Sequence, residues 1–379
     1  MSEYQYYEWQ TLERPLSAAE QTAVNGLSSH IDVTSSQAVV TYNWGDFKHD
    51  PIKVLARYFD AHLYIANWGT RRLAFRFPKE LVDVDAIERY CDEDHVHIKT
   101  VGDVQVLEFE MNEEEGFDEW VEERGLLSAL ARLRDDILQG DYRALYLAWL
   151  NAMSQESGHY DEDEDDPENF FNDPEPPLPA GLKQLTPPLK ALADFFEIDP
   201  LLISAASERS PDLTPFQQAD FTSLISRLSR QECDEFLLKI LNGEPGAVMA
   251  LHKRLHSFEN PLPRVDTNPR AFGELLKTAE KLRQAESRRQ AEARRKRHIA
   301  EMQELAKREA QTWQEVENLL QSRYSARSYD DATALLSKLQ QLSEFQGTQT
   351  NFKTRVRELN ERYKKRTALI ERWKKKGWI

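Results

Sequence analysis

The sequence has 379 residues, more than the roughly 250 to 300 at which a single core stops growing, so we expect two or three domains. Hydrophobic residues make up 40% of the chain and aromatic residues 10%, which excludes a wholly disordered protein. The net charge of −16 is unevenly divided: residues 270–379 hold 26 Lys and Arg against 15 Asp and Glu, a net of +11, and residues 1–269 hold 23 against 50, a net of −27.

Residues 1–112 predict an α+β domain with a mostly antiparallel sheet, because strand-like and helix-like stretches alternate without regular βαβ spacing. Strands are expected at residues 4–10, 31–34, 38–42, 62–67, 72–77, 96–101 and 104–111, the last two forming a hairpin. A capping box, Ser17 with Glu20, opens a helix to about residue 29. Asp50 and Pro51 open another helix to residue 59, and a third is expected at residues 84–90.

The middle of the chain is predicted to consist of three segments. Residues 113–158 form a helical extension of the first domain. Residues 159–180 combine the acid run from Asp161 to Asp166 with five prolines and predict an acidic, Pro-rich linker that is disordered or extended. Residues 181–268 predict a small all-helical domain, with helices at residues 187–197, 200–207, 215–229, 231–242 and 246–258.

Residues 269–379 predict a long basic helix followed by an antiparallel helical bundle. The long helix runs past Leu320, and alanine is the only apolar residue type between residues 286 and 298. Residues 299–320 then carry apolar side chains at spacings of three and four, a coiled-coil seam through which the chain could form a homo-oligomer. A capping box at Ser328 and Asp331 opens the next helix, Gly347 ends it, and the last helix spans residues 350–375.

Parts of this tail resemble a helical segment of conserved bacterial proteins. The resemblance rests on Trp313, Val316, residues 329–336 and residues 355–359, and it covers less than a fifth of the chain. It implies helical structure and no activity.

The location of the protein is suggested by three features. Cys91 and Cys233 match neither a disulfide framework nor a paired metal-binding motif, which favours a reducing compartment. The N-terminal residues lack the apolar run of a signal peptide. No window approaches the roughly 18 apolar residues of a membrane span. We therefore expect a cytoplasmic protein that does not bind membranes.

Motifs for nucleotide binding and catalysis are absent from the sequence. It holds no P-loop, dinucleotide-binding, nucleophile-elbow, zinc-protease or paired Cys-x-x-Cys motif. We therefore expect no cofactor and lean against an enzyme, although a nuclease built from scattered carboxylates would leave no such motif.

The densest group of chemistry-bearing residues lies between Tyr42 and Phe77. Its aromatic rings either form the core of the domain or, if exposed, form a surface that binds a peptide or stacks on bases. The residues of that candidate binding surface are Trp44, Trp68, Arg71, Arg72 and Arg76.

The same stretch offers a less favoured catalytic centre. Its candidate metal ligands or acid/base residues are Asp46, Asp50, Asp60 and His62. His95 and His97 would share one face of a strand and could add ligands, but nothing in the sequence brings them to Asp60. No metal site is therefore predicted.

Basic blocks in the tail are candidates for nucleic-acid contact. Residues 353–376 hold 11 basic residues against 3 acidic ones, enough to bind a polyanion through counterion release. A solvated helix face and an acidic protein surface, its own included, stay open as alternatives. The candidate contact residues are Arg294, Arg295, Lys296, Arg297, Lys364, Lys365, Arg366, Lys374, Lys375 and Lys376.

These patterns favour a non-enzymatic adaptor or scaffold. It would bind a protein partner through the acidic α+β half, and nucleic acid or an assembly partner through the basic helical tail. The alternative hypothesis is a metal-dependent enzyme or enzyme subunit acting on nucleic acid. A third hypothesis is autoinhibition, in which the acid run or the acidic half covers the basic tail.

Overall fold

The computed structural model describes residues 3–92, 94–112, 123–158, 172–213, 221–244, 246–258, 264–265, 269–322 and 325–379. The chain divides into two compact units, Met1–Arg283 and Gln284–Ile379. Helix α13 (Phe272–Lys307) continues across the boundary between them.

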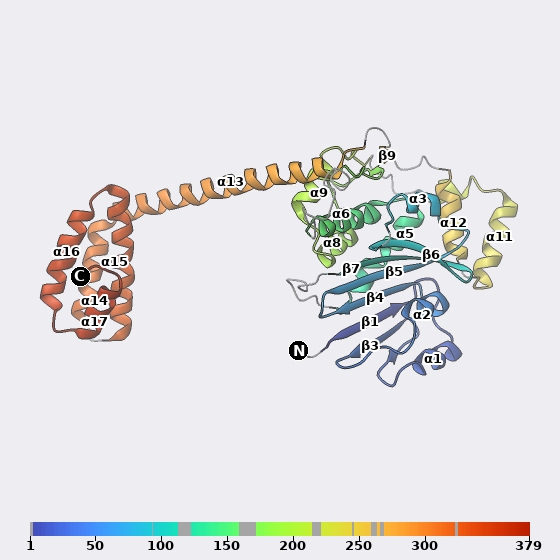
Figure 1. Ribbon diagram of the computed structural model, residues 1–379, viewed down its shortest axis with the longest axis horizontal. Helices are drawn as coiled ribbons and strands as arrows, with labels where there is room; N and C mark the ends of the chain where they lie inside the picture. The colour runs from blue at the N-terminus through green and yellow to red at the C-terminus, as the bar shows by residue number, and fades with distance from the viewer. Residues whose placement is uncertain are drawn as a thin grey trace, which may run out of the picture. The chain divides into compact units, whose positions relative to one another are not determined.

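A seven-stranded sheet lies at the centre of the N-terminal unit (Figure 1). Its strands, in their spatial order, are β2 (Asp32–Val33), β3 (Gln37–Tyr42), β1 (Gln5–Gln10), β4 (Ala61–Ala66), β5 (Thr70–Pro78), β7 (Val104–Asn112) and β6 (Val96–Val101). All pairings between these strands are antiparallel, which confirms the sheet predicted for residues 1–112.

The two faces of the sheet enter different cores, because successive residues of a strand point to opposite sides. On β1, Tyr6 joins one core, whereas Tyr7 and Trp9 join the other. Helix α2 (Pro51–Tyr58) packs on the second face through Val54 and Leu55. We call the core that contains Tyr6 the helix-covered core and the face that carries Tyr7 the α2 face.

The predicted caps in this region are confirmed. Helix α1 (Ala18–Asn25) begins with the capping box of Ser17 and Glu20. Asp50 caps α2 by accepting hydrogen bonds from the amides of Ile52 and Lys53. Helix α3 (Val84–Glu88) completes the elements before residue 112.

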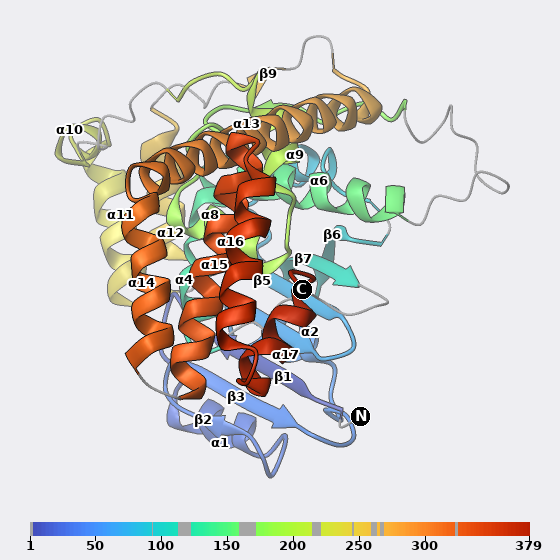
Figure 2. The same cartoon turned by 90° about the vertical axis from the view of Figure 1, so that its left-hand side faces the viewer.

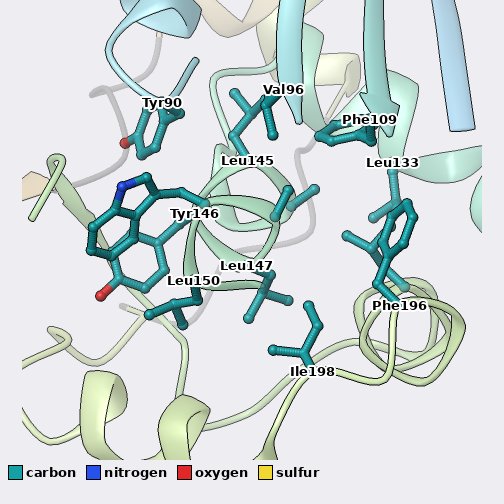
Figure 3. Packing of buried hydrophobic residues seen from close by; sticks show 14 of the residues in the cluster. Tyr90, Val96, Phe109, Leu133, Leu145, Tyr146, Leu147, Leu150, Phe196 and Ile198 are labelled. Atoms are coloured by element: carbon teal, nitrogen blue, oxygen red, sulfur yellow. The ribbon is translucent and has the colours of Figure 1, made fainter. Parts of the chain in front are cut away.

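One continuous core joins the sheet to helices that follow it in the chain. These helices are α4 (Leu126–Leu130), α5 (Arg132–Leu138), α6 (Arg143–Gly158), α8 (Pro187–Phe195) and α9 (Pro200–Ser207). Figure 3 shows leucines of α6 packed between Val96 and Phe109 of the sheet and Phe196 and Ile198, which follow α8. Helices α8 and α9, which lie in the segment predicted as a small all-helical domain, therefore share one hydrophobic core with the sheet.

The segment predicted as an extended linker is partly packed into this unit. The acid run of residues 161–166 lies outside the described residues, but residues 175–182 are buried. Strand β8 (Leu178–Pro179) pairs with β9 (Arg264–Val265), and Tyr90 donates a hydrogen bond of 2.7 Å to the Pro177 carbonyl. Prolines lack a donor but keep their carbonyl acceptor, so apolar neighbours can bury such a segment once partners from other parts of the chain satisfy its carbonyls.

A small group of three helices completes the N-terminal unit. It consists of α10 (Phe221–Ile225), α11 (Arg230–Leu241) and α12 (Ala247–His256), packed around Leu224, Leu228 and Leu255. The Gly246 amide, at the start of α12, donates a hydrogen bond of 2.7 Å to the carboxylate of Glu13, and so connects these helices to the loop that follows β1.

The C-terminal unit is a helical bundle in which α14 (Glu309–Ser322), α15 (Ala326–Gln346) and α16 (Gln349–Tyr363) lie side by side (Figure 2), followed by α17 (Thr367–Lys375). The predicted seam is buried inside it, where Met302, Trp313, Val316 and Leu320 pack against α15, α16 and α17. The chain's own helices therefore occupy the seam proposed for a homo-oligomer.

Three helix boundaries in this unit differ from prediction. The long helix breaks at Arg308. Helix α15 takes Ser325 as its cap and not Ser328, whose amide donates to the Ser325 hydroxyl at 3.1 Å. The last predicted helix is interrupted at residues 364–366. Gly347 ends α15 with a φ of 73°, as predicted.

The basic middle of α13 is exposed at every residue from 286 to 298, which confirms that it lies in no core. None of the helices in the described ranges is both long and apolar enough to cross a membrane.

Candidate functional site

A cleft of about 420 Å³ opens on the α2 face of the sheet. Its floor comes from β1, β4, β5, β7 and β6, and its rim comes from Trp68 and from the loop that leads into α2 at Asp50. Clefts of this size hold small molecules or the side chains of a peptide.

Strand register aligns side chains, most of them polar or aromatic, across the floor in two rows, although all of these strands except the edge strand β6 lie inside the sheet. The first row is Tyr7, Tyr64, Arg72 and Glu110. The second row is Trp9, His62, Ala74, Glu108 and His97. Directly paired side chains in adjacent strands have Cβ atoms about 5 Å apart, so each row is a continuous contact surface.

Two sets of ion pairs neutralise the cations of the floor. Arg72 donates to the Glu110 carboxylate at 2.7 Å, and its guanidinium lies 5.6 Å from the centre of the Tyr64 ring. Oε2 of Glu108 accepts hydrogen bonds from Lys99 at 2.9 Å and from His97 at 3.2 Å. Burial alone would raise the pKa of Glu108, but these two hydrogen bonds outweigh it and lower the pKa to about 2. Glu108 is therefore a buried carboxylate anion.

Gln5 ties the loop at the rim to the floor. Its side-chain carbonyl accepts hydrogen bonds from the hydroxyls of Tyr7 at 2.6 Å and Tyr64 at 3.0 Å. Its amide donates to Asp46 at 2.8 Å and to the carbonyl of Gly45 at 3.0 Å. Gly45 has a φ of 74°, a conformation that favours glycine and turns the loop back towards the sheet.

His62, in the second row of the floor, is a neutral hydrogen-bond acceptor. Its Nδ1 lies 2.9 Å from the backbone carbonyl of Glu8, and because a carbonyl only accepts, Nδ1 carries the proton and Nε2 holds a lone pair. The ring stacks on Trp9 at 4.8 Å and is fully buried, and this burial lowers its pKa to about 4. At neutral pH His62 therefore cannot supply a proton.

The structure brings most residues of the two candidate sites in the Tyr42 to Phe77 stretch to this cleft. Trp68, Arg72, Asp46, Asp50 and His62 line it. Trp44, on the same loop as Asp46, is 73% exposed and Trp68 is 44% exposed, whereas Phe47 and Phe59 are buried. The rings of Trp44 and Trp68 are thus surface groups and not core.

Three of the candidate residues are held elsewhere. Arg71 is buried, donates to the Phe195 carbonyl and pairs with Glu197 at 2.9 Å. Arg76 pairs with Asp60 at 2.5 Å. Asp60 also accepts hydrogen bonds from two backbone amides, so its oxygens already have partners.

The remaining carboxylates have structural partners too, Asp50 as the cap of α2 and Asp46 as an acceptor for Gln5. His95 lies beside Asp92 and Glu156 and so belongs to a different site from His97. Over the part of the chain that the structure describes, no three His, Cys, Asp or Glu side chains are arranged to hold a metal ion.

Several lining residues went unnoticed in the sequence, namely Gln5, Tyr7, Tyr64, Lys99, Glu108 and Glu110. The sequence carries a signal for two of them in β7, where Glu108 and Glu110 alternate with the apolar residues Leu107, Phe109 and Met111. Alternation of this kind indicates one polar face, but it does not reveal that neighbouring strands add aromatic and basic groups to the same face.

The second candidate site is the basic surface of the C-terminal unit. On α13, Arg294, Arg295 and Arg297 are exposed, and Lys296 pairs with Glu292 at 2.7 Å. At 100° per residue these four side chains point in different directions around the helix, so they form a positively charged rod and not a single face.

The last two helices carry a second group of exposed lysines. Lys364, Lys365 and residues 374–376 are exposed, and Lys364 lies 3.4 Å from Glu361. Arg366 differs, because it donates to the Leu320 carbonyl at 2.5 Å and lies 4.5 Å from the centre of the Tyr363 ring, so its guanidinium holds the bundle together.

The cleft and the basic surface are the features from which a function can be argued. One is a half-enclosed site with fixed charges and aromatic rings, and the other is an open polycationic surface. No protein-family model, no curated protein and no solved structure matches the chain.

Proposed function

We propose that this protein is a non-enzymatic adaptor, which binds nucleic acid through its basic C-terminal unit and a protein partner through its N-terminal unit. The observation that carries the proposal is the exposure of cations that have no acidic partner among the described residues. They are Arg294, Arg295, Arg297, Lys365, Lys374, Lys375 and Lys376.

Free surface cations favour a polyanion for a physical reason. Each one that neutralises a phosphate releases a condensed counterion, and the logarithm of the binding constant falls with the logarithm of salt concentration by about 0.9 per contact on duplex DNA. Seven such contacts would give a slope of roughly −6. Because the three arginines point in different directions around α13, contact through the backbone phosphates is favoured over readout of base sequence.

A role without catalysis is supported by the hydrogen bonds of the candidate catalytic residues. Asp46, Asp50 and Asp60 are each held by donors of the chain itself, and His62 is neutral with a low pKa. The exposed rings of Trp44 and Trp68 beside the cleft fit a surface that docks a protein, because exposed aromatic residues are enriched at protein interfaces.

Binding of the full-length protein to duplex DNA between about 50 and 200 mM salt tests the proposal. Replacing Lys374, Lys375 and Lys376 with glutamine should lower affinity and reduce the salt slope by up to about 2.7. The matched control replaces Lys48, Lys79 and Lys190, which are exposed lysines of the N-terminal unit, and should leave the slope unchanged.

Three outcomes would overturn the proposal. The first is a slope for the Lys374 to Lys376 variant equal to that of the control, and the second is equal binding of DNA and polyglutamate, which would point to an acidic assembly partner. The third is cleavage of nucleic acid upon addition of Mg²⁺, which would exclude a non-enzymatic role.

A further inference from the structure

Several acceptors of the cleft keep hydrogen-bonding capacity that the chain does not use. Tyr7 and Tyr64 have donated their hydroxyl protons to Gln5, so their oxygens can only accept further hydrogen bonds. Nε2 of His62 is an acceptor, because the proton is on Nδ1. Oε1 of Glu108 receives no donor within the described parts of the chain, since both its partners bind Oε2.

The charge of the cleft also favours a cation. Four carboxylates line it, those of Asp46, Asp50, Glu108 and Glu110, against two permanent cations, Arg72 and Lys99. Both cations are already paired with floor carboxylates, so the lining keeps a net charge of −2 when the histidines are neutral, carried by Asp46 and by Asp50, which lies 3.5 Å from Lys53. An incoming cation reduces this excess of negative charge, whereas an incoming anion adds to it.

Aromatic rings complete the site. The rings of Tyr7, Tyr64, Phe47 and Trp68 contribute to its lining. A planar guanidinium stacks on such rings and offers five N–H donors to separate acceptors, whereas an ammonium offers three and is more strongly hydrated.

We infer that this cleft binds the arginine side chain of a peptide segment in the protein partner, with its guanidinium donating to Glu108, His62 and the tyrosine oxygens. This inference names the chemistry of the partner and rests on the protein-binding half of the proposed function.

A peptide fits the site better than a free guanidino compound for two reasons. Nε of Arg72, a donor, and Nδ1 of His97, an acceptor because Nε2 carries the proton that Glu108 accepts, are buried without a hydrogen-bond partner in the described part of the chain. The carbonyl and the amide of a peptide bond next to the arginine would supply a partner for each. The cavity of about 420 Å³ also exceeds the needs of one guanidinium, and the exposed Trp44 ring extends the contact surface beyond it.

The test measures binding of fluorescein-labelled Gly/Ser peptides to the full-length protein by fluorescence anisotropy. One peptide carries a central arginine, the second has citrulline at that position, and the third has lysine. Citrulline keeps the size and planarity of the side chain but loses its charge. Binding of the arginine peptide should exceed that of the citrulline peptide by about tenfold or more, with lysine between them. Free arginine should compete weakly.

Variants locate the binding to the cleft. Glu108→Gln and Glu110→Gln should each weaken binding of the arginine peptide about tenfold, because each removes an anion from the floor. Glu88→Gln is the matched control, since Glu88 is an exposed acid of α3 outside the cleft and its loss changes the net charge equally. Glu110→Gln keeps the test valid if Glu108→Gln fails to fold, because the Glu110 side chain is 18% exposed and that of Glu108 only 4%.

Equal binding of the arginine and citrulline peptides, equal affinities of the Glu110→Gln and Glu88→Gln variants, or no binding up to about 1 mM protein would overturn the inference. Tighter binding of free arginine than of the peptide would point to a small-molecule site and also overturn it. DNA binding by the same variants separates the two proposals, because loss of peptide binding with unchanged DNA binding contradicts only the arginine site.

Discussion

Replacing Asp60 with asparagine is expected to destabilise the N-terminal unit by about 3 kcal/mol, because the carboxylate is a buried acceptor for donors from three parts of the chain. Its Oδ2 accepts from the amides of Leu12 and Glu13, at 2.7 and 3.1 Å, and its Oδ1 accepts from Arg76 at 2.5 Å. Arg134 lies 3.9 Å away. Only 2% of the Asp60 side chain is exposed, so solvent screens these interactions weakly.

The magnitude follows from what asparagine can replace. Its carbonyl can keep both backbone amides, but its NH₂ group would face Arg76 as a second donor, and a hydrogen bond to a charged group contributes roughly 1.5–3 kcal/mol. Removing one member of a buried ion pair costs about 3–5 kcal/mol. The lower end applies here, since Arg134 keeps its pairing with Glu13 at 2.5 Å.

The stability difference between wild type and Asp60→Asn should depend on pH. Burial would raise the pKa of Asp60, but Arg134, Arg76 and the two amides outweigh it and hold the pKa below its ordinary value. A carboxyl with a lowered pKa stabilises the fold above its unfolded pKa of about 3.9, and this contribution is lost as pH falls through the folded value. The difference between wild type and Asp60→Asn should therefore be largest near pH 7 and shrink below about pH 4.

Urea unfolding followed by circular dichroism, from about pH 3 to pH 7, measures this difference. Asp103→Asn is the control, because Asp103 is exposed in the β6–β7 turn and should change stability by less than about 0.5 kcal/mol. A loss below about 1 kcal/mol for Asp60→Asn, or a loss that does not change with pH, would refute the structural role given to Asp60.

Three further outcomes are expected. Arg270→Met should cost about 3–5 kcal/mol in urea unfolding, because it removes the two hydrogen bonds from Arg270 to the buried Glu175 carboxylate, at 2.7 and 2.8 Å, and leaves it with the Tyr146 hydroxyl as its side-chain donor. A loss below about 1 kcal/mol would contradict this. Trp313→Ala removes a buried side chain of the bundle and should lower the free energy of unfolding by about 3–5 kcal/mol. It should abolish hydrogen-exchange protection in the bundle, whereas protection of β5 should stay at the wild-type level if the two units unfold separately. In NMR titrations His62 should stay neutral at Nε2 from pH 8 down to about 5, with a midpoint near 4, and a midpoint above about 6 would exclude the assigned burial and tautomer.

Local chemistry was readable from the sequence wherever a signal acts within a few residues. Ser17 with Glu20 and Asp50 with Pro51 define helix starts through backbone hydrogen bonds and a fixed φ, and both starts are confirmed. The start of α15 was misplaced because Ser325 and Ser328 both offer a capping hydroxyl. The earlier cap adds another turn of helix before Tyr329, which is buried in the bundle.

Contacts between distant residues decide which segments share a core. Composition predicts that residues 159–180 cannot form a core alone. It does not show that Glu175 is bound by Arg270 and that Leu178 pairs with a strand 87 positions later. Such partners exist only once the sheet and helices α6, α8 and α9 share one core.

Part of the candidate site could be predicted from the sequence, because side chains alternate along a strand. Arg71 and Arg72 are adjacent on β5, so one must point to each face of the sheet, and strand periodicity predicts that much. Which face is open is decided by α6 and α8, which cover the side of Arg71, and by α2, which leaves the side of Arg72 partly uncovered. No local sequence pattern predicts which helices cover which face of the sheet.

Residue type alone does not tell which carboxylates keep a free acceptor oxygen, because this depends on the donors that reach each carboxylate after folding. Asp60 is of a residue type that binds metal ions, yet both of its carboxylate oxygens already accept hydrogen bonds from the chain. Glu108 lies between apolar residues of β7. One of its carboxylate oxygens has no donor among the described residues, and the cleft that it lines also contains aromatic rings. An unfilled acceptor beside aromatic rings is the arrangement that an arginine side chain satisfies, and this is why the binding proposal rests on Glu108 and not on the aspartates.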